Sequence, residues 1–264
     1  MTDATDGDAG DLTARVLQFG PVLGDVEANA ATIEEGLLAA AEDGVDLFVV
    51  PELALTGYHI DEGTDELVAD AEAALDSLAG VAPGVTAVVG TPLAEGKSLY
   101  NSAAVLDGGE RVGAYHKTHL YGDFEEATFD AGDDFPVFET AAGDVGVEIC
   151  YDVEFPEPAR QLAKNGAEVV VTMSANMRPY ELDQRTYLRA RAMENVRPHV
   201  LCNRVGSERD ADFFGESAIV DERGRDVVRA GADREATITG TVSRAATGDE
   251  TLQYFRDRRP EIYR

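Results

Sequence analysis

The chain has 264 residues, and 44% of them are hydrophobic, which is enough for a substantial core in one large domain. It carries 51 Asp and Glu residues against 22 Lys and Arg, a formal net charge of −29 at pH 7. This charge argues against nucleic acid and anionic membranes as partners, because both require clustered cations, and no apolar run approaches the roughly 18 residues of a membrane-spanning helix.

Residues 1–12 are small and acidic, and we predict that they form a solvated N-terminal tail. They contain neither the basic n-region nor the apolar h-region of a signal peptide, so we expect a cytoplasmic protein. Residues 13–264 are predicted to form a single domain, because no linker, low-complexity tract or break in composition divides them.

The first half of the domain alternates between strand-like and helix-like segments. Residues 26–41 are predicted to form a helix, with Ile33 and Leu37 on one apolar face and Asp25 as the N-cap. Residues 47–50 are a short, continuous apolar run, which is typical of a strand buried on both faces. The other predicted elements are strands at 15–19, 86–89, 99–106 and 112–116 and a helix at 64–78.

The second half repeats this alternation. Strands are predicted at 137–139, 145–149, 169–173, 200–203, 217–220 and 236–242, and helices at 157–164 and 182–196, the latter ended by Pro198. Such an order of hairpins and crossovers indicates a layered α/β domain.

Three of the apolar segments end on groups that a cysteine hydrolase needs. The run before Pro51 leads to Glu52, the segment 113–116 leads to Lys117, and the run 145–149 leads to Cys150. A thiol at the end of a buried strand, where a helix is about to begin, can be exposed as a nucleophile among backbone N–H groups. Taken singly, Cys150 also suits a buried structural thiol and Lys117 a solvated surface residue.

The remaining cysteine and the histidines show no sign of a metal site. Cys202 lies in the apolar stretch 199–202 and is interpreted as a small buried hydrophobe. No CxxC motif and no Cys/His metal spacing occurs, so we expect neither a metal nor a cofactor.

The acidic composition favours adaptation to high intracellular salt. Lys97, Lys117 and Lys164 are the only lysines. At 1 M salt, screening acts over roughly 3 Å and removes most self-repulsion between surface carboxylates. An acidic protein from an ordinary cytoplasm is the alternative, and full folding and activity after dialysis to low salt would favour it.

Residues 51–58, 115–120 and 148–157 resemble, in order and spacing, the motifs of the nitrilase superfamily of carbon–nitrogen hydrolases. The resemblance covers nearly the whole chain. It implies an α/β fold, a four-layer αββα sandwich that packs as αββα–αββα in a homodimer or a higher homo-oligomer. It also implies a Glu-Lys-Cys triad, which maps onto Glu52, Lys117 and Cys150.

The chemistry assigns a role to each member of this triad. Cys150 would be the nucleophile, and Glu52 would accept its proton and later protonate the leaving ammonia, a double task that suits a carboxyl group with a raised pKa. Lys117 and the backbone N–H of Tyr151 would stabilise the oxyanion of the tetrahedral intermediate.

Other site residues follow from position in the motifs. By resemblance, Glu125 would hold the Lys117 ammonium, although the adjacent Glu126 is an alternative and either can be a surface acid. Tyr58 is expected to line the pocket or to pack in the core. Asn176 is expected either to bind a substrate amide or to cap a turn.

The sequence therefore predicts a hydrolase of a non-peptide C–N bond, most simply one that converts a small amide to a carboxylic acid and ammonia through a cysteine thioester. The motifs look more like those of the amidase branch than those of true nitrilases. Alternatives are an N-carbamoyl amine or amino-acid hydrolase, then a nitrilase, and a catalytically silent binding protein on the same scaffold. Small amide-type substrates and water are the expected partners.

Overall fold

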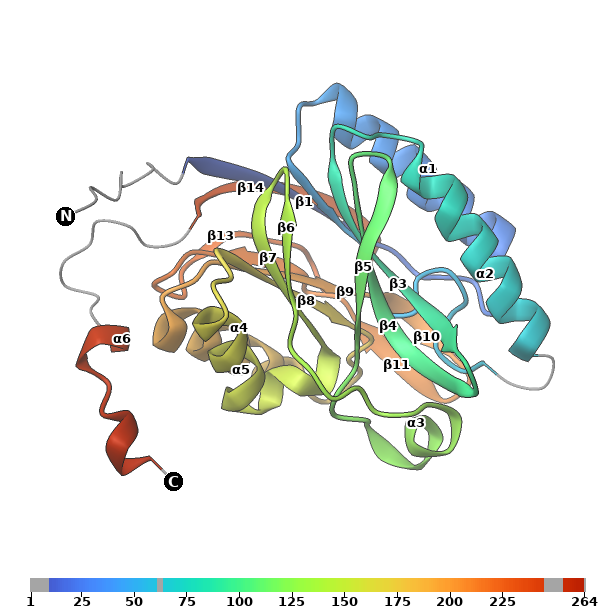
Figure 1. Cartoon of the computed structure of the whole chain (residues 1–264). Coiled ribbons are helices and arrows are strands. Elements are labelled where there is room, and N and C mark those ends of the chain that lie inside the picture. Colours follow the sequence, from blue (N-terminus) through green and yellow to red (C-terminus); the bar gives the residue numbers. More distant parts are fainter. Residues whose placement is uncertain (1–9, 61–63, 245–253, 264) are drawn as a thin grey trace.

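The structure, a computed structural model, describes residues 10–60, 64–244 and 254–263, so most of the predicted acidic tail lies outside it. Two six-stranded sheets pack face to face, and each is covered by helices on its outer side (Figure 1). This is the four-layer αββα arrangement that the resemblance implied. The packing of a second subunit against it stays a prediction.

The first sheet has the strand order β14-β1-β2-β3-β4-β5. Strands β1, β2 and β3 are parallel, whereas β14 pairs antiparallel with β1, and β3, β4 and β5 form an antiparallel meander. The strands are β1 Asp11–Gln18, β2 Leu47–Val49, β3 Thr86–Glu95, β4 Ser98–Asp107, β5 Glu110–His116 and β14 Ala236–Ser243.

The second sheet has the order β13-β12-β9-β8-β7-β6, with β7, β8 and β9 parallel at its centre. Its strands are β6 Val137–Thr140, β7 Gly143–Ile149, β8 Val169–Ser174, β9 His199–Asn203, β12 Ala218–Val220 and β13 Asp226–Arg229. A separate hairpin of β10 Val205–Glu208 and β11 Ala211–Phe214 lies beside the two sheets.

The period-two alternation of strand side chains separates the two cores. In β2, Leu47 and Val49 belong to the core between the sheets, together with Val147 and Ile149 of β7. Phe48, which points the other way, belongs to a second core on the outer side of the first sheet. Burial on both faces explains why these central strands read as continuous apolar runs.

The helices cover the outer faces. Helix α1 (Val26–Glu42) and helix α2 (Thr64–Ala79) lie on the first sheet, while α4 (Pro156–Lys164) and α5 (Glu181–Asn195) lie on the second (Figure 1). Asp25 caps α1 as predicted, because its Oδ1 accepts a hydrogen bond from Ala28 N at 3.1 Å. The remaining helices are α3 Gly122–Thr128, the terminal α6 Tyr254–Asp257 and the 3₁₀ turns η1 Cys150–Glu154 and η2 Pro260–Ile262.

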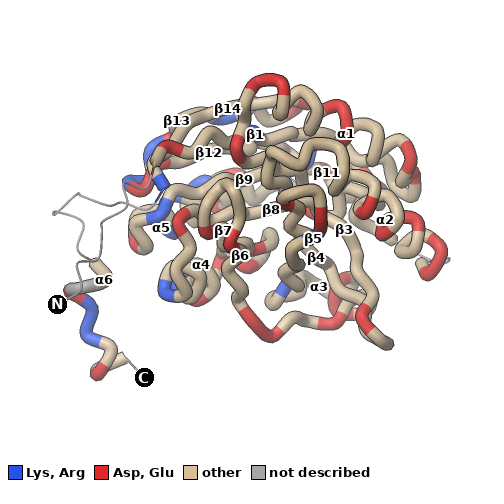
Figure 2. The backbone as a smooth tube through the Cα atoms, turned by 45° about the horizontal axis from the view of Figure 1, so that its top comes forward, with Lys and Arg blue, Asp and Glu red and all other residues tan. Residues whose placement is uncertain are grey.

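Charge is divided between the two helical layers. Helices α1 and α2 carry acidic side chains and no Lys or Arg, whereas α5 carries Arg185, Arg189 and Arg191. Figure 2 shows this difference as red segments along α1 and α2 and blue ones near α5.

The predicted strands and helices are all present, with bounds that mostly differ by one to three residues. The prediction for 86–89 was wrong in length, because β3 continues through Gly90 and Pro92 to Glu95. Strands β10, β11 and β13 and helix α3 were missed. These elements are short, and apart from the buried end of β11 their side chains are largely polar or part-exposed, so they lack the apolar periodicity on which the predictions were based.

Within the described residues, no helix is long and apolar enough to cross a membrane, and no group of three or more His, Cys, Asp or Glu side chains is arranged to hold a metal ion.

Gly90 lets the segment after β2 lie directly on β3. A Cβ at this position would lie 2.1 Å from the Pro51 carbonyl oxygen and 2.9 Å from Glu52 Cα. We expect Gly90→Ala to displace this backbone and to lower the free energy of unfolding by about 1–3 kcal/mol, as overpacking typically does. Urea unfolding at constant high salt measures the effect. Gly84→Ala is the control, because a Cβ at position 84 meets no atom within 4 Å, and equal losses in the two variants would contradict this account.

Candidate active site

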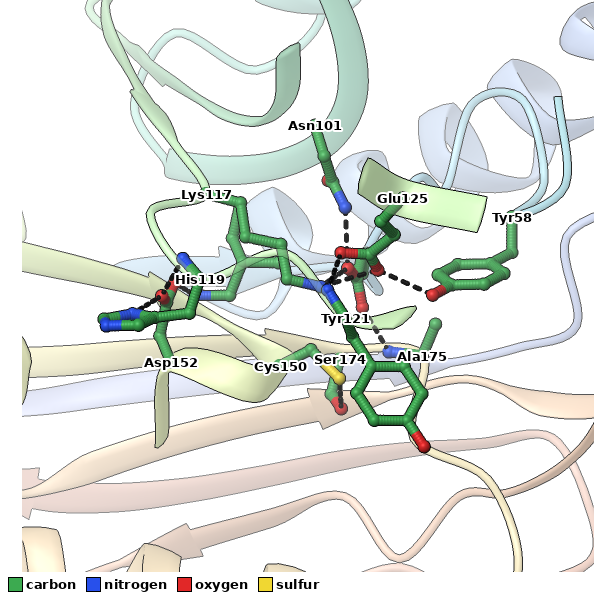
Figure 3. A network of polar contacts seen from close by, with 12 residues as sticks. Tyr58, Asn101, Lys117, His119, Tyr121, Glu125, Cys150, Asp152, Ser174 and Ala175 are labelled. Atoms are coloured by element: carbon green, nitrogen blue, oxygen red, sulfur yellow. Dashed lines mark hydrogen bonds and ion pairs between the residues drawn. The ribbon is translucent and has the colours of Figure 1, made fainter. Parts of the chain in front are cut away.

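Three strand ends bring the predicted triad together. Glu52 follows β2, Lys117 directly follows β5, and Cys150 directly follows β7. β2 and β5 belong to one sheet and β7 to the other, so the three residues stand at the ends of strands from both sheets. The side chains of Lys117 and Cys150 extend toward the same region (Figure 3).

Glu52 is fully buried, and both of its carboxylate oxygens accept hydrogen bonds. Oε1 accepts from Lys117 Nζ at 2.8 Å and from Asn101 Nδ2 at 2.7 Å, and Oε2 accepts from Ala175 N at 2.7 Å. Burial raises the pKa of Glu52 above its ordinary value, and this effect outweighs the opposing charge of Lys117. Glu52 is therefore a carboxylate that gains a proton more readily than an exposed one.

Lys117 is also fully buried, so it is not the solvated surface lysine of the alternative reading. Its Nζ donates to Glu52 Oε1 at 2.8 Å and to Glu125 Oε1 at 2.7 Å. Burial by itself disfavours the ammonium, but the two carboxyl groups outweigh it and raise the pKa of Lys117 well above its ordinary value. The side chain thus remains a fixed positive charge.

Glu125, and not Glu126, is the acid that contacts the lysine. It is the buried residue of the short helix α3, whereas Glu126 is exposed. Besides Lys117, its Oε1 accepts from the Tyr58 hydroxyl at 2.6 Å, and its Oε2 accepts from Tyr121 N at 2.8 Å. The missed helix α3 is therefore the element that carries the second carboxylate to the site.

Cys150 begins the 3₁₀ turn η1 with a left-handed backbone, φ +46°. A non-glycine residue in this region is strained, and such strain occurs at functional sites where the surrounding structure enforces it. The half-buried side chain lies against Ser174, whose Oγ donates to Sγ at 3.3 Å. Burial raises the pKa of the Cys150 thiol, and Glu52 adds to this while Lys117 opposes it. The resting thiol is thus protonated and requires a base.

Tyr151, the next residue of the same turn, was expected to provide an oxyanion donor. The second residue of a 3₁₀ turn has no partner for its N–H within the turn. The role of Tyr151 as an oxyanion donor stays a prediction.

Asp152 connects the cysteine turn to the lysine segment, a role that the sequence analysis missed. Its buried carboxylate accepts from Ile149 N at 2.9 Å and from the Tyr115 hydroxyl at 2.7 Å on one oxygen, and from Thr118 Oγ1 and His119 N at 2.9 and 3.0 Å on the other. The contacts span both sheets. An acid two residues after Cys150, inside the motif at 148–157, was the available signal.

Three further buried residues, Arg191, Glu208 and Arg204, hold the site from outside. Arg191 of α5 donates through Nε to Val153 O and through Nη2 to Glu154 O, both at 2.9 Å, and so fixes the end of η1. Glu208 of β10 accepts from the backbone N–H of Tyr58 and of His59, at 3.1 and 2.7 Å. Buried Arg204 pairs with Glu208 at 2.8 Å.

A cavity of about 240 Å³ opens at Cys150, a size suited to a small molecule. It is lined by Tyr58, Tyr121, Cys150, Tyr151, Glu154, Ala175, Asn176, Met177 and Tyr180. Tyr58 both lines the cavity and is 4% exposed, so the two expectations for it coincide. Asn176 lines the wall, but its Oδ1 accepts from Met177 N at 2.9 Å, which is a local cap.

Most of the chain is also similar to known proteins. A sequence profile of the carbon–nitrogen hydrolase family matches residues 13–249. This chain belongs to that family. Among relatives, a hydrolase of the pqqF 5′ region from Pseudomonas protegens is 37% identical, with 90% of this chain and 86% of the relative covered. An (R)-stereoselective amidase from Pseudomonas sp. is 34% identical over 89% of this chain and 87% of its own length. An N-carbamoylputrescine amidase from Solanum tuberosum is 31% identical, covering 96% and 94%.

Solved structures of family members have the same fold. The amidase of Nesterenkonia sp. AN1 superimposes with a TM-score of 0.86 at 27% identity, covering 99% of this chain and 98% of the other, in a variant whose active-site cysteine carries the acetamide moiety of fluoroacetamide. A carbon–nitrogen hydrolase from Helicobacter pylori gives a TM-score of 0.86 at 26% identity, covering 97% and 98%. The protein is thus a nitrilase-superfamily hydrolase in sequence and in fold.

Glu125 and Glu126 offer a matched pair of substitutions. We expect Glu125→Gln to lower kcat by about a hundredfold, because the ammonium loses one of its two charged anchors and with it its place at the oxyanion. Glu126→Gln removes an equal charge from the exposed side of α3 and should leave kcat within about twofold. Steady-state ammonia release with circular dichroism as a folding check measures both, and similar kcat values for the two variants would contradict this assignment.

Proposed function

We propose that this carbon–nitrogen hydrolase converts small amides to carboxylic acids and ammonia, with Cys150 as the nucleophile, Glu52 as the general base and acid, and Lys117 as the oxyanion stabiliser. The observation that carries the proposal is that Lys117 bridges Glu52 and Glu125. These two acids accept hydrogen bonds from Ala175 and Tyr58, which line the cavity that opens on Cys150.

The first half-reaction begins with a neutral thiol, because burial raises the pKa of Cys150. Glu52 accepts the thiol proton while Sγ bonds to the amide carbon, and the C=O electron pair moves to oxygen. The Lys117 ammonium and the Tyr151 N–H stabilise this oxyanion. When the C=O bond re-forms, the C–N bond breaks and Glu52 gives its proton to the departing ammonia, which leaves a thioester on Cys150.

The second half-reaction hydrolyses the thioester. Glu52 accepts a proton from water as the water oxygen bonds to the acyl carbon, and the same two donors stabilise the second oxyanion. Its collapse breaks the C–S bond and returns the proton to sulfur, so the acid is released and the thiol is restored. One carboxyl group alternates between base and acid, which a raised pKa favours.

A second candidate is hydrolysis of an N-carbamoyl amine, which uses the same attack and also releases CO₂. The 31% identity to an N-carbamoylputrescine amidase supports this candidate. A nitrilase reaction ranks third.

A substrate screen at high salt tests the proposal. Small amides, N-carbamoyl amines and nitriles are supplied in parallel, and both ammonia and CO₂ are followed. We expect ammonia without CO₂ from amides, and a loss of all turnover in Cys150→Ala. CO₂ release would favour the carbamoyl reaction, and turnover of nitriles alone would refute amide hydrolysis. Unchanged turnover in Cys150→Ala, or a Cys150 inert to iodoacetamide in a protein without turnover, would contradict the catalytic role.

The raised pKa of Glu52 also predicts a pH dependence. The ionised form accepts the proton, so kcat/KM should fall as the pH decreases through a value above 4.5, the ordinary glutamate pKa. A profile of kcat/KM against pH at constant salt measures this limb.

Substitution at Glu52 provides the check on that limb. Glu52→Gln should lose at least about a hundredfold in kcat/KM at every pH, and its residual activity should lack the acid limb. Glu126→Gln should keep the limb in place. A limb at the ordinary glutamate pKa, or one that persists in Glu52→Gln, would rule out Glu52 as the base.

A further inference from the structure

The wall of the active-site cavity carries a single charged side chain. Of the residues that line it, Glu154 alone has a carboxyl group, and none is Lys, Arg or His; the others are tyrosines, Ala175, Asn176, Met177 and the Cys150 thiol. The buried charges behind the wall are one ammonium between two carboxyl groups. A substrate in this cavity therefore meets no free cation and one carboxylate.

The Glu154 carboxylate has no protein partner among the described residues. Arg191 is nearby, but it donates to the Glu154 backbone carbonyl and, through Nη1, to Glu194 Oε1 at 3.0 Å. Partial burial raises the pKa of Glu154, and the charge of Asp183 raises it further. Such an acid is half-buried, lies near another acid and has no cation beside it. A positively charged ligand would stabilise its ionised form.

The aromatic side chains favour the same kind of ligand. Tyr58, Tyr121, Tyr151 and Tyr180 all line the cavity, and the rings of Tyr121 and Tyr151 lie edge to face at 5.3 Å. Ring faces attract ammonium groups, and together with a carboxylate they form a typical binding site for an organic amine. An anionic group would be repelled by Glu154, and the ring faces would not attract it.

We propose that the enzyme selects small amides that carry a protonated amine, with Glu154 as the residue that determines this specificity. The inference rests on the proposed function. Cys150 and Glu154 stand at the two ends of η1, where a rise of about 2 Å per residue separates their Cα atoms by about 8 Å. The ammonium group therefore lies a few methylene groups from the carbonyl that Cys150 attacks.

A matched series of amides tests this specificity. γ-Aminobutyramide is cationic, valeramide is its neutral isostere, and succinamate is an anionic analogue. Ammonia release gives kcat/KM for each, with Cys150→Ala as the blank for spontaneous cyclisation. We expect the wild-type enzyme to prefer the cationic amide to valeramide by at least about tenfold, and to use succinamate least well.

Substitution separates Glu154 from the general acidity of the chain. Glu154→Gln should lower the ratio of kcat/KM for the cationic amide to that for valeramide by about tenfold or more. Glu157→Gln is the matched control, because Glu157 is an exposed acid of the next turn and does not line the cavity. It should leave the preference unchanged. Glu154→Arg should shift the preference toward succinamate.

The outcomes distinguish this inference from the proposed function. If valeramide is hydrolysed through Cys150 but the wild type shows no cation preference, or Glu154→Gln leaves that preference intact, the specificity is overturned and amide hydrolysis stands. If none of the amides is hydrolysed by a folded wild-type protein whose Cys150 reacts with iodoacetamide, both fail together. An equal effect of Glu157→Gln would assign the preference to net charge and overturn the role of Glu154.

Discussion

The ion pairs of Lys117 with Glu52 and Glu125 are the interaction on which the site depends. All three side chains are fully buried. Transfer of such charges from water costs several kcal/mol each, and only close, well-satisfied partners offset the cost. The network supplies such partners. The Lys117 ammonium and all four carboxylate oxygens of Glu52 and Glu125 make hydrogen bonds of 2.6–2.8 Å. Any change that removes one partner leaves an uncompensated buried charge near Cys150.

Hydrogen bonds from other parts of the fold hold this network in position. Asp152 joins the segment after β5 to the turn after β7, and therefore one sheet to the other at the catalytic end. Arg191 holds η1 from the side of α5, and Glu208 holds the backbone at Tyr58 from the side of β10. In the proposed mechanism none of these three groups reacts. They fix the positions of Glu52, Lys117 and Cys150, as preorganised electrostatic stabilisation demands.

The acidic side chains of α1 and α2 lie away from the candidate active site. Acidic side chains cover α1 and α2, on the face of the first sheet remote from the second. The single cation of the site is buried and paired, so it is shielded from both this surface field and dissolved salt. Glu154, at the cavity wall, is where the acidity of the chain reaches the substrate.

The sequence by itself determined the layered α/β fold, the predicted strands and helices and the choice of Glu52, Lys117 and Cys150 as candidates, because apolar periodicity and short motifs are local properties of the chain. Several features emerged only in the tertiary structure. Glu125 rather than Glu126 meets the lysine because of the rotation of α3, whose seven residues carry little periodic signal. Asp152, Asn101 and Glu208 gain their roles from partners 30 or more residues away in the chain. Glu154 is one acid among many until η1 turns it toward the cavity. Burial, pairing and cavity walls depend on how distant strand ends converge, and no local pattern encodes that convergence.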